Sequence, residues 1–314
     1  MFKQSVIQWI LFFYIYCFIG WVWETAYVSI KKWKYTNRGF MKGPFLPIYG
    51  FGALAILVAT IPVKDSKPLT FLVGMLAATI LEYITGEAME ALFKVRYWDY
   101  SNQKFNLNGH ICLTSSIAWG VASILMVNVI HVPIADFVNN IPRLLQEIIA
   151  VLLSIGVSVD MATSVRDALD IKEMLINLKQ NNEEIQKLQK RLDVVIAVLD
   201  DETKNIRNKI EQLVDTRQDD ESNSSGRALE SIRKRFDVVE KFTAQIEWKG
   251  KDKQHLDAKL EFERLKEKLL VSITKMELRK TKFLERPHKM LRRNPTAVSK
   301  KYQNELDEMK ILRK

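Results

Sequence analysis

Cysteine is nearly absent from the 314-residue sequence, which contains only Cys17 and Cys112. Two cysteines cannot form a disulfide framework, and both lie in or beside apolar stretches, where a thiol behaves as a small hydrophobic group. Neither has a second sulfur or a histidine at metal-ligand spacing. The sequence therefore predicts no redox centre, no metal site and no bound cofactor.

Several nucleotide-binding and hydrolytic motifs are missing as well. Without a Gly-x-x-x-x-Gly-Lys-Ser/Thr phosphate-binding loop, ATP hydrolysis would have to come from another polypeptide. The sequence also lacks a Gly-x-Gly-x-x-Gly run after a strand, a His-Glu-x-x-His zinc motif and a Gly-x-Ser-x-Gly nucleophile elbow. These absences favour a non-enzymatic protein, but they leave open an enzyme that uses another arrangement of side chains.

Charged side chains are distributed unevenly along the chain. Up to Thr163 there are 12 Lys and Arg and 9 Asp and Glu, against 35 and 28 in the remainder. The first half is too apolar for a water-soluble domain, and the second half is too charged to lie in lipid. We therefore predict a transmembrane domain over residues 1–165 and a charged helical tail over residues 166–314.

The net charge of +10 resembles that of nucleic-acid-binding proteins. Most of the chain's charge, however, belongs to the mixed-sign tail, and a basic excess near a membrane sets orientation and lipid contact. We therefore expect the lipid bilayer as a partner and no nucleic acid.

Five apolar stretches approach or reach the length of a membrane-spanning helix, which is about 20 residues. They are roughly Val6–Ile30, Phe45–Val63, Leu69–Val95, Ile111–Ile130 and Leu144–Thr163. Proline residues flank two of the turns between them, Pro62 and Pro68 in one and Pro133 and Pro142 in the other. The pattern predicts an all-α protein with a five-helix transmembrane bundle.

Lysine and arginine are concentrated in the connections after the first and third stretches. These basic residues are Lys31, Lys32, Lys34, Arg38, Lys42, Lys94, Arg96 and Lys104. Because cytoplasmic loops carry the excess of Lys and Arg, both connections are expected to face the cytoplasm. The N-terminus is then outside, and an odd number of spans places the tail inside.

The tail repeats apolar residues at seven-residue spacing. The repeat contains Ile171, Leu178, Ile185, Leu192, Leu199, Ile206 and Leu213. This spacing predicts a coiled coil, and two further amphipathic helices follow, around Phe236 and Phe262. The helices either fold back as a bundle or self-associate, or they dock a cytosolic partner. A basic stretch near Arg286 and Arg293 either contacts anionic lipid or is solvated.

Acidic residues within the apolar stretches are the strongest indication of a site, because each costs roughly 2.5–3.5 kcal/mol to insert in a membrane. Glu82 lies 13 residues after Leu69, or about 20 Å deep at helical rise. Glu24 and Asp160 lie in the inner parts of the first and fifth stretches. We infer a polar cavity that opens to the cytoplasm. The alternative is a set of internal salt bridges with Arg38 or Arg96.

The residues expected to line this cavity are polar or aromatic and lie at mid-depth or on the cytoplasmic side. They are Glu24, Arg38, Tyr49, Glu82, Glu87, Trp98, Asp99, Tyr100, Asn108, Ser116 and Trp119. The Gly- and Pro-rich segment 37–52 is expected to form an ordered, re-entrant start of the second span. Segment 98–113 is expected to lead similarly into the fourth span. Backbone amides at these helix starts would favour an anion, although structural turns explain the same residues.

Short motifs occur in a fixed order through the first half. They are Gly20-Trp21 with Glu24, Arg38-Gly39-Phe40, Gly43-Pro44, Pro47-Ile48-Tyr49-Gly50, Glu82-Tyr83 with Gly86, Trp98-Asp99-Tyr100-Ser101, Asn106-Leu107-Asn108-Gly109, Ile111-Cys112-Leu113, and Ser116 with Trp119-Gly120. By this set, residues 8–166 resemble the membrane-protein family named putative ABC-transporter type IV, or CmpB-like. The resemblance implies a bacterial, multi-pass inner-membrane protein with a permease-like role and no established substrate.

Three functions are compatible with these features. The first is a permease-like component that binds its solute in the cavity and works with a separate ATPase subunit. The second is a non-catalytic membrane anchor, scaffold or sensor that works through its coiled-coil tail. The third is a membrane-embedded enzyme for a lipid or phosphate-bearing substrate, in which the acids or Tyr100 act as base or cation ligand and Arg38 holds the anion. Because five spans are few for a complete transport pathway, a homodimer is also expected.

Overall fold

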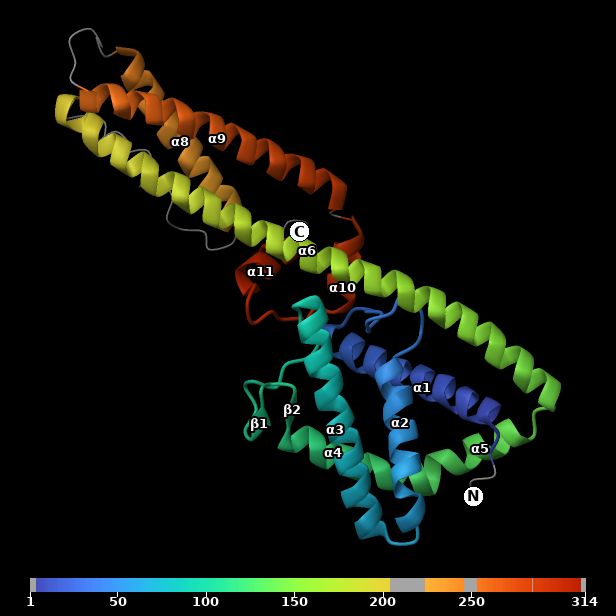
Figure 1. Ribbon diagram of the computed structural model, residues 1–314. Coiled ribbons are helices and arrows are strands. Elements are labelled where there is room, and N and C mark those ends of the chain that lie inside the picture. Colours follow the sequence, from blue (N-terminus) through green and yellow to red (C-terminus); the bar gives the residue numbers. More distant parts are fainter. Residues whose placement is uncertain (1–3, 204–223, 246–252, 284, 312–314) are drawn as a thin grey trace. The chain divides into compact units, whose positions relative to one another are not determined.

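The computed structural model describes residues 4–203, 224–245, 253–283 and 285–311, and these are almost entirely helical (Figure 1). The elements are α1 (Val6–Lys32), α2 (Pro47–Thr60), the 3-10 turn η1 (Ile61–Val63), α3 (Lys67–Phe93), β1 (Asn106–Leu107), β2 (Ile111–Cys112), α4 (Leu113–Leu125), the π-helix η2 (Met126–Ile130), α5 (His131–Asn139), α6 (Arg143–Thr203), α8 (Ser224–Gln245), α9 (Lys253–Phe283), α10 (Glu285–Arg293) and α11 (Gln303–Ile311). The predicted heptad positions Ile206 and Leu213 lie outside the described residues.

The chain forms two compact units. Unit 1 contains Met1–Lys172 and Arg286–Lys301, and unit 2 contains Glu173–Glu285 and Tyr302–Lys314. The predicted domain boundary at residue 165 lies within α6, which continues without a break through that position. Residues 286–301 pack in unit 1, where the side chains of Met290, Leu291 and Ala297 are buried.

Four helical stretches are long and apolar enough to cross a membrane: Val6–Lys32, Lys67–Phe93, Leu113–Asn139 and the apolar part of α6. Their outward faces are apolar as well, with α6 exposing Leu152, Ile155 and Val159, as a helix in contact with lipid would. The second predicted stretch, Phe45–Val63, corresponds to α2 and η1, which form a shorter apolar helix.

The predicted turn between Pro133 and Pro142 is shorter than expected. The helix continues through Pro133 to Asn139, and the π-helix η2 precedes α5 directly. Proline is tolerated in the first turn of a helix, and a single π turn accommodates a change of hydrogen-bond register there. The fourth apolar stretch therefore runs nine residues beyond its predicted end at Ile130.

Small residues allow the apolar helices of unit 1 to approach closely. A Cβ atom on Gly50 of α2 would collide with Cys17 of α1, and one on Gly74 of α3 would collide with Ser123 of α4. Close contact of this kind is typical of helices that pack in membranes, where van der Waals contact replaces the hydrophobic drive. The packed interior contains Phe12 from α1 and Ile56 and Leu57 from α2.

Unit 2 has a hydrophobic core of its own, built from α6, α8 and α9. The heptad residues Ile185, Leu192 and Leu199 of α6 are buried in it. The rings of Phe236 from α8 and Phe262 from α9 stack with centroids 5.5 Å apart. This part of the predicted heptad seam is therefore covered by helices of the same chain.

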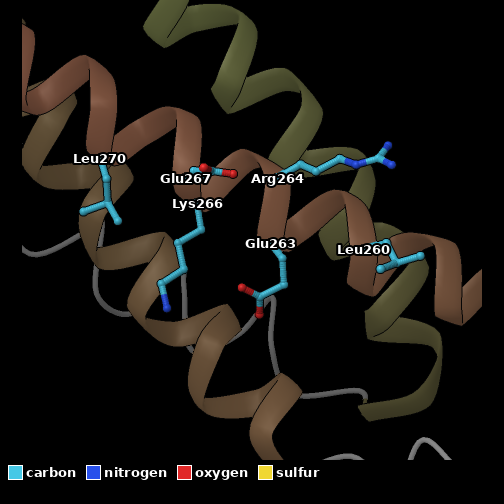
Figure 2. Close-up of a pocket in the computed structure, with 6 residues that line it drawn as sticks. All are labelled: Leu260, Glu263, Arg264, Lys266, Glu267 and Leu270. Carbon is cyan, nitrogen blue, oxygen red and sulfur yellow. The ribbon is translucent and has the colours of Figure 1, made fainter.

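An open groove of about 410 Å³ lies on α9 of unit 2 (Figure 2). Its lining is Leu260, Glu263, Arg264, Lys266, Glu267 and Leu270, all on one helix. Lys266 forms an ion pair with Glu240 of α8. None of the predicted site residues lies in this groove, which is the charged outer surface of the helix.

We predict that Phe262→Ala destabilises unit 2 by about 3–5 kcal/mol, because Phe262 is fully buried in its core. The measurement is urea unfolding of the full-length protein in detergent, followed by hydrogen exchange of α9 peptides. The control is Leu260→Ala on the same helix, whose side chain is 58 % exposed. It should change the stability by less than about 0.5 kcal/mol. Equal sensitivity of the two variants would contradict the assigned core.

Candidate functional site

Two non-helical segments, residues 33–46 and 94–112, connect the helices at one end of unit 1, which we call the loop end. Segment 33–46 starts at Trp33, which caps the end of α1 with a left-handed backbone conformation (φ of 50°). It then folds back along α1, because the backbone amide of Leu46 donates to the carbonyl of Cys17 at 3.0 Å. Helix α2 therefore starts beside the middle of α1, and segment 33–46 is an ordered lead into it.

Glu24 of α1 is held by groups from α2 and segment 33–46. The hydroxyl of Tyr49 donates to Glu24 Oε1 at 2.8 Å, and Arg38 Nε lies 4.0 Å from Glu24 Oε2. Tyr49 fits against α1 because Gly20 has no side chain at the point where the tyrosine ring packs. The predicted ion pair between Glu24 and Arg38 is thus present, at the outer limit of contact.

Glu82 of α3 is held by neutral donors, namely the side chains of Trp119, Tyr100 and Ser115. Trp119 Nε1 of α4 donates to Glu82 Oε2 at 3.0 Å, and the hydroxyl of Tyr100 donates to Glu82 Oε1 at 3.3 Å. Glu82 is only 6 % exposed. A buried carboxylate that lacks hydrogen-bond donors is strongly unfavourable, and these donors meet this requirement without an arginine.

The two carboxylates belong to one group of side chains, because the rings of Tyr49 and Trp119 pack with centroids 5.9 Å apart. We call this group the paired-carboxylate cluster. It consists of Glu24, Arg38, Tyr49, Glu82, Tyr100 and Trp119. The structure therefore brings together six of the eleven residues predicted for the site, from four helices and both loop-end segments.

Arg38 has further hydrogen-bond partners besides Glu24. Its Nη2 donates to the carbonyl of Tyr97 at 3.0 Å and to Thr296 Oγ1 at 3.0 Å, and its Nη1 donates to Asn294 Oδ1 at 3.2 Å. Burial lowers the pKa of Arg38, and the charge of Glu24 opposes this shift. Because the ordinary pKa of arginine exceeds 12, the guanidinium remains charged at neutral pH.

Tyr100 is positioned as a hydrogen-bond donor by its surroundings. Burial raises the pKa of the Tyr100 phenol, and the nearby charge of Glu82 raises it further. The phenol therefore keeps its proton throughout the physiological pH range and donates a hydrogen bond to Glu82.

Glu87 and Asp99 lie in a second group, which we call the His110 cluster. His110 Nε2 lies 3.1 Å from Glu87 Oε2 and 3.2 Å from Glu90 Oε2. Arg96 joins this group through contacts with Glu90 at 2.6 Å and Asp99 at 3.4 Å. Internal salt bridges, the predicted alternative to a cavity, are thus present among these acids. Arg96 pairs with Glu90 and Asp99, whereas Arg38 pairs with Glu24.

Trp98 and Asn108 maintain the shape of segment 94–112. Trp98 Nε1 donates to the carbonyl of His110 at 2.9 Å, and Asn108 Nδ2 donates to the Tyr83 hydroxyl at 3.2 Å. Asn108 has a φ of 54°, a left-handed conformation that asparagine tolerates. Ser116 is half-buried near the start of α4, and no hydrogen bond joins it to either cluster in the described part of the chain.

Asp160 of α6 lies apart from the two carboxylates with which the sequence analysis grouped it. Its carboxylate accepts hydrogen bonds from the backbone amides of Lys42 at 3.0 Å and Gly43 at 2.7 Å. Asp160 therefore fixes segment 33–46 against α6. Of the three deep acids expected to converge, Glu24 and Glu82 belong to one cluster, and Asp160 supports the loop beside it.

A metal site is not apparent in the described ranges, where no group of three or more His, Cys, Asp and Glu side chains could hold an ion.

Sequence reasoning missed two sets of residues. Asn294 and Thr296 contact Arg38 from more than 250 positions away in the chain, and no local sequence pattern predicts that contact. The second is a buried pair in which the Tyr16 hydroxyl lies 3.0 Å from His131 Nδ1. Here a signal existed, because a histidine at the end of an apolar stretch requires a polar partner.

Comparison with known proteins identifies one relationship. The family model described as Putative ABC-transporter type IV matches residues 11–165, which contain all six residues of the paired-carboxylate cluster. No curated protein and no solved structure matches the chain.

We predict that Gly20→Ala disrupts the cluster, because a Cβ atom at this position would collide with the ring of Tyr49. Overpacking of this kind costs about 1–3 kcal/mol, and it should displace Tyr49 from Glu24. The measurement is the Tm of the protein in detergent. Gly156→Ala is the matched control, since nothing lies within 4 Å of a Cβ atom there. A Tm for Gly20→Ala equal to that of the control would show that α1 and α2 are packed differently.

Proposed function

Because residues 11–165 belong to the ABC-transporter type IV family, we propose that the chain is a permease-like membrane component that binds its solute at the paired-carboxylate cluster. The observation that carries this proposal is the meeting of Glu24 and Glu82 through Tyr49 and Trp119. Ionisable groups inside membrane segments are costly, and where they gather from several helices they mark pathways for ions or solutes.

The charges of the cluster suit a polar solute. Glu82 is bound by neutral donors, so a donor or cationic group of the solute can pair with it. Arg38 lies beside Glu24 and has neutral oxygens as its other partners, so its charge can attract an anionic group of the solute. In this proposal, a cavity opens beside the cluster toward the cytoplasm.

The proposed topology has five spans in the bacterial inner membrane, with the N-terminus outside and the tail in the cytoplasm. The second of these spans is the shorter helix formed by α2 and η1, which the re-entrant segment 33–46 precedes. The loop end then lies on the cytoplasmic side, in keeping with its lysines and arginines.

ATP hydrolysis would come from a separate subunit, because the sequence has no phosphate-binding loop. In this proposal, the helical tail docks that subunit or another cytosolic protein, and two copies of the chain form a homodimer.

A second candidate function is that of a membrane scaffold that works through its tail. The observation that favours it is the separate hydrophobic core of unit 2. The two functions differ in where they place the essential residues, either in the paired-carboxylate cluster or on the surface of unit 2.

The test of function is purification of the full-length protein from native membranes, followed by identification of any ATPase that accompanies it. We predict that Glu82→Gln lowers ATP hydrolysis by that complex by about tenfold or more, because an amide replaces an ionisable acceptor of hydrogen bonds. Glu87→Gln, in the His110 cluster, is the control and should stay within about twofold. An absent ATPase, together with full function of Glu82→Gln in cells, would favour the scaffold.

We predict opposite accessibilities for Asp65→Cys and Lys104→Cys in intact cells. Both positions are exposed, and Cys17 and Cys112 are buried and should react little. A membrane-impermeant maleimide should label residue 65 in intact cells and residue 104 only after lysis. Labelling of both positions from outside would exclude an odd number of spans with a cytoplasmic tail.

A further inference from the structure

The C-terminal segment Arg286–Lys301 packs on the loop end as part of unit 1 (Figure 1). Arg96 and Val298 exchange two backbone hydrogen bonds, at 2.8 and 3.0 Å, and the Ser299 hydroxyl donates to the carbonyl of Lys94. Met290 and Ala297 of this segment are fully buried. These contacts join the segment to segment 94–112 over several residues.

Asn294 links this segment to the other loop-end segment, residues 33–46. Its amide nitrogen Nδ2 donates to the carbonyl of Gly39 at 2.9 Å, and its Oδ1 accepts a hydrogen bond from Arg38 at 3.2 Å. The same nitrogen donates to the carbonyl of Met290 at the end of α10. Asn294 is 2 % exposed. Its amide is therefore fixed by three groups and presents a single orientation to Arg38.

Thr296 supplies the second contact with Arg38. Its Oγ1 accepts a hydrogen bond from Arg38 Nη2 at 3.0 Å, and that nitrogen also donates to the Tyr97 carbonyl. The terminal nitrogens of Arg38 are thus held by Asn294, Thr296 and Tyr97, while its Nε lies 4.0 Å from Glu24. Because a guanidinium is planar and rigid, fixing its two terminal nitrogens also fixes the direction of Nε.

We propose that Asn294 and Thr296 are positioning residues of the paired-carboxylate cluster, which the C-terminal segment completes by holding the Arg38 guanidinium toward Glu24. This rests on the proposed function only in treating the cluster as the binding site. The two residues act through Arg38. Their oxygens are neutral, so they orient the guanidinium without cancelling its charge, and the charge remains available to an anionic group of a solute.

The experiment measures the reactivity of Arg38 toward phenylglyoxal, which modifies free guanidinium groups, in the full-length protein in native membranes. Mass spectrometry of the digested protein gives the rate at each arginine. The variants are Thr296→Val, which keeps the shape but loses the acceptor, and Thr296→Ser, which keeps the hydroxyl. Thr296 is exposed, so neither variant disturbs a packed core. Arg292 is exposed on α10 and serves as the internal reference.

We expect Thr296→Val to increase the rate at Arg38 by about two- to tenfold, which corresponds to the loss of one hydrogen bond. Thr296→Ser should restore the wild-type rate. Asn294→Ala should also increase the rate at Arg38. In each case the rate at Arg292 should be unchanged, because the segment stays docked through its backbone pairing with Arg96.

Three results would overturn the proposal: an unchanged rate in Thr296→Val, the same acceleration in Thr296→Ser, or equal acceleration at Arg38 and Arg292. The last would mean that the segment has detached as a whole. These rates do not depend on an ATPase or a solute. An absent ATPase together with full function of Glu82→Gln would therefore count against the permease and leave this assignment standing, while a working ATPase complex would not rescue the assignment if these rates contradict it.

Discussion

The arrangement of the loop end depends on one requirement, which is to provide hydrogen-bond donors for two acids that lie among apolar helices. Glu82 accepts hydrogen bonds from Trp119 of α4 and Tyr100 of segment 94–112. Glu24 accepts one from Tyr49 of α2. A carboxylate buried without such donors would cost several kcal/mol, so the helices that carry the donors must meet at these points. The close approach of α2 to α1 is one means to this end, because the absence of a side chain at Gly20 leaves room for the ring of Tyr49.

The two acidic groups at the loop end differ in character. In the His110 cluster, Glu90 and Asp99 contact the guanidinium of Arg96 and Glu87 contacts His110 Nε2, so each acid has a basic side chain as its partner. In the paired-carboxylate cluster, the one cation lies at the limit of contact with Glu24, and Glu82 has neutral partners. Acids paired with basic side chains fix the shape of a loop, whereas a buried acid with only neutral partners can still pair with a charged group of a solute. This contrast is the physical basis for assigning function to the paired-carboxylate cluster.

Hydropathy and helix period were sufficient to locate the helices of unit 1, because apolar runs and prolines are local signals. The starts of α1 and α3 lie within two residues of the predicted ones. The candidate site was accessible for a related reason, since acids in apolar runs are rare and costly. Asp160 was misgrouped because depth along a helix does not say which way a side chain faces. Asn294 could not be found because its partners, Arg38 and the Gly39 carbonyl, are distant in sequence and carry no periodic signal.

The separation of 258 residues between Arg38 and Thr296 has a consequence for biosynthesis. At a translation rate of about 5–20 residues per second, on the order of 10–50 s pass between the synthesis of these two residues. Helices α2 to α5 are made within this interval, and Asn294 and Thr296 are the last of the hydrogen-bond partners of Arg38 to be synthesised. Residues 286–301 must therefore leave the ribosome before the loop end acquires its final form.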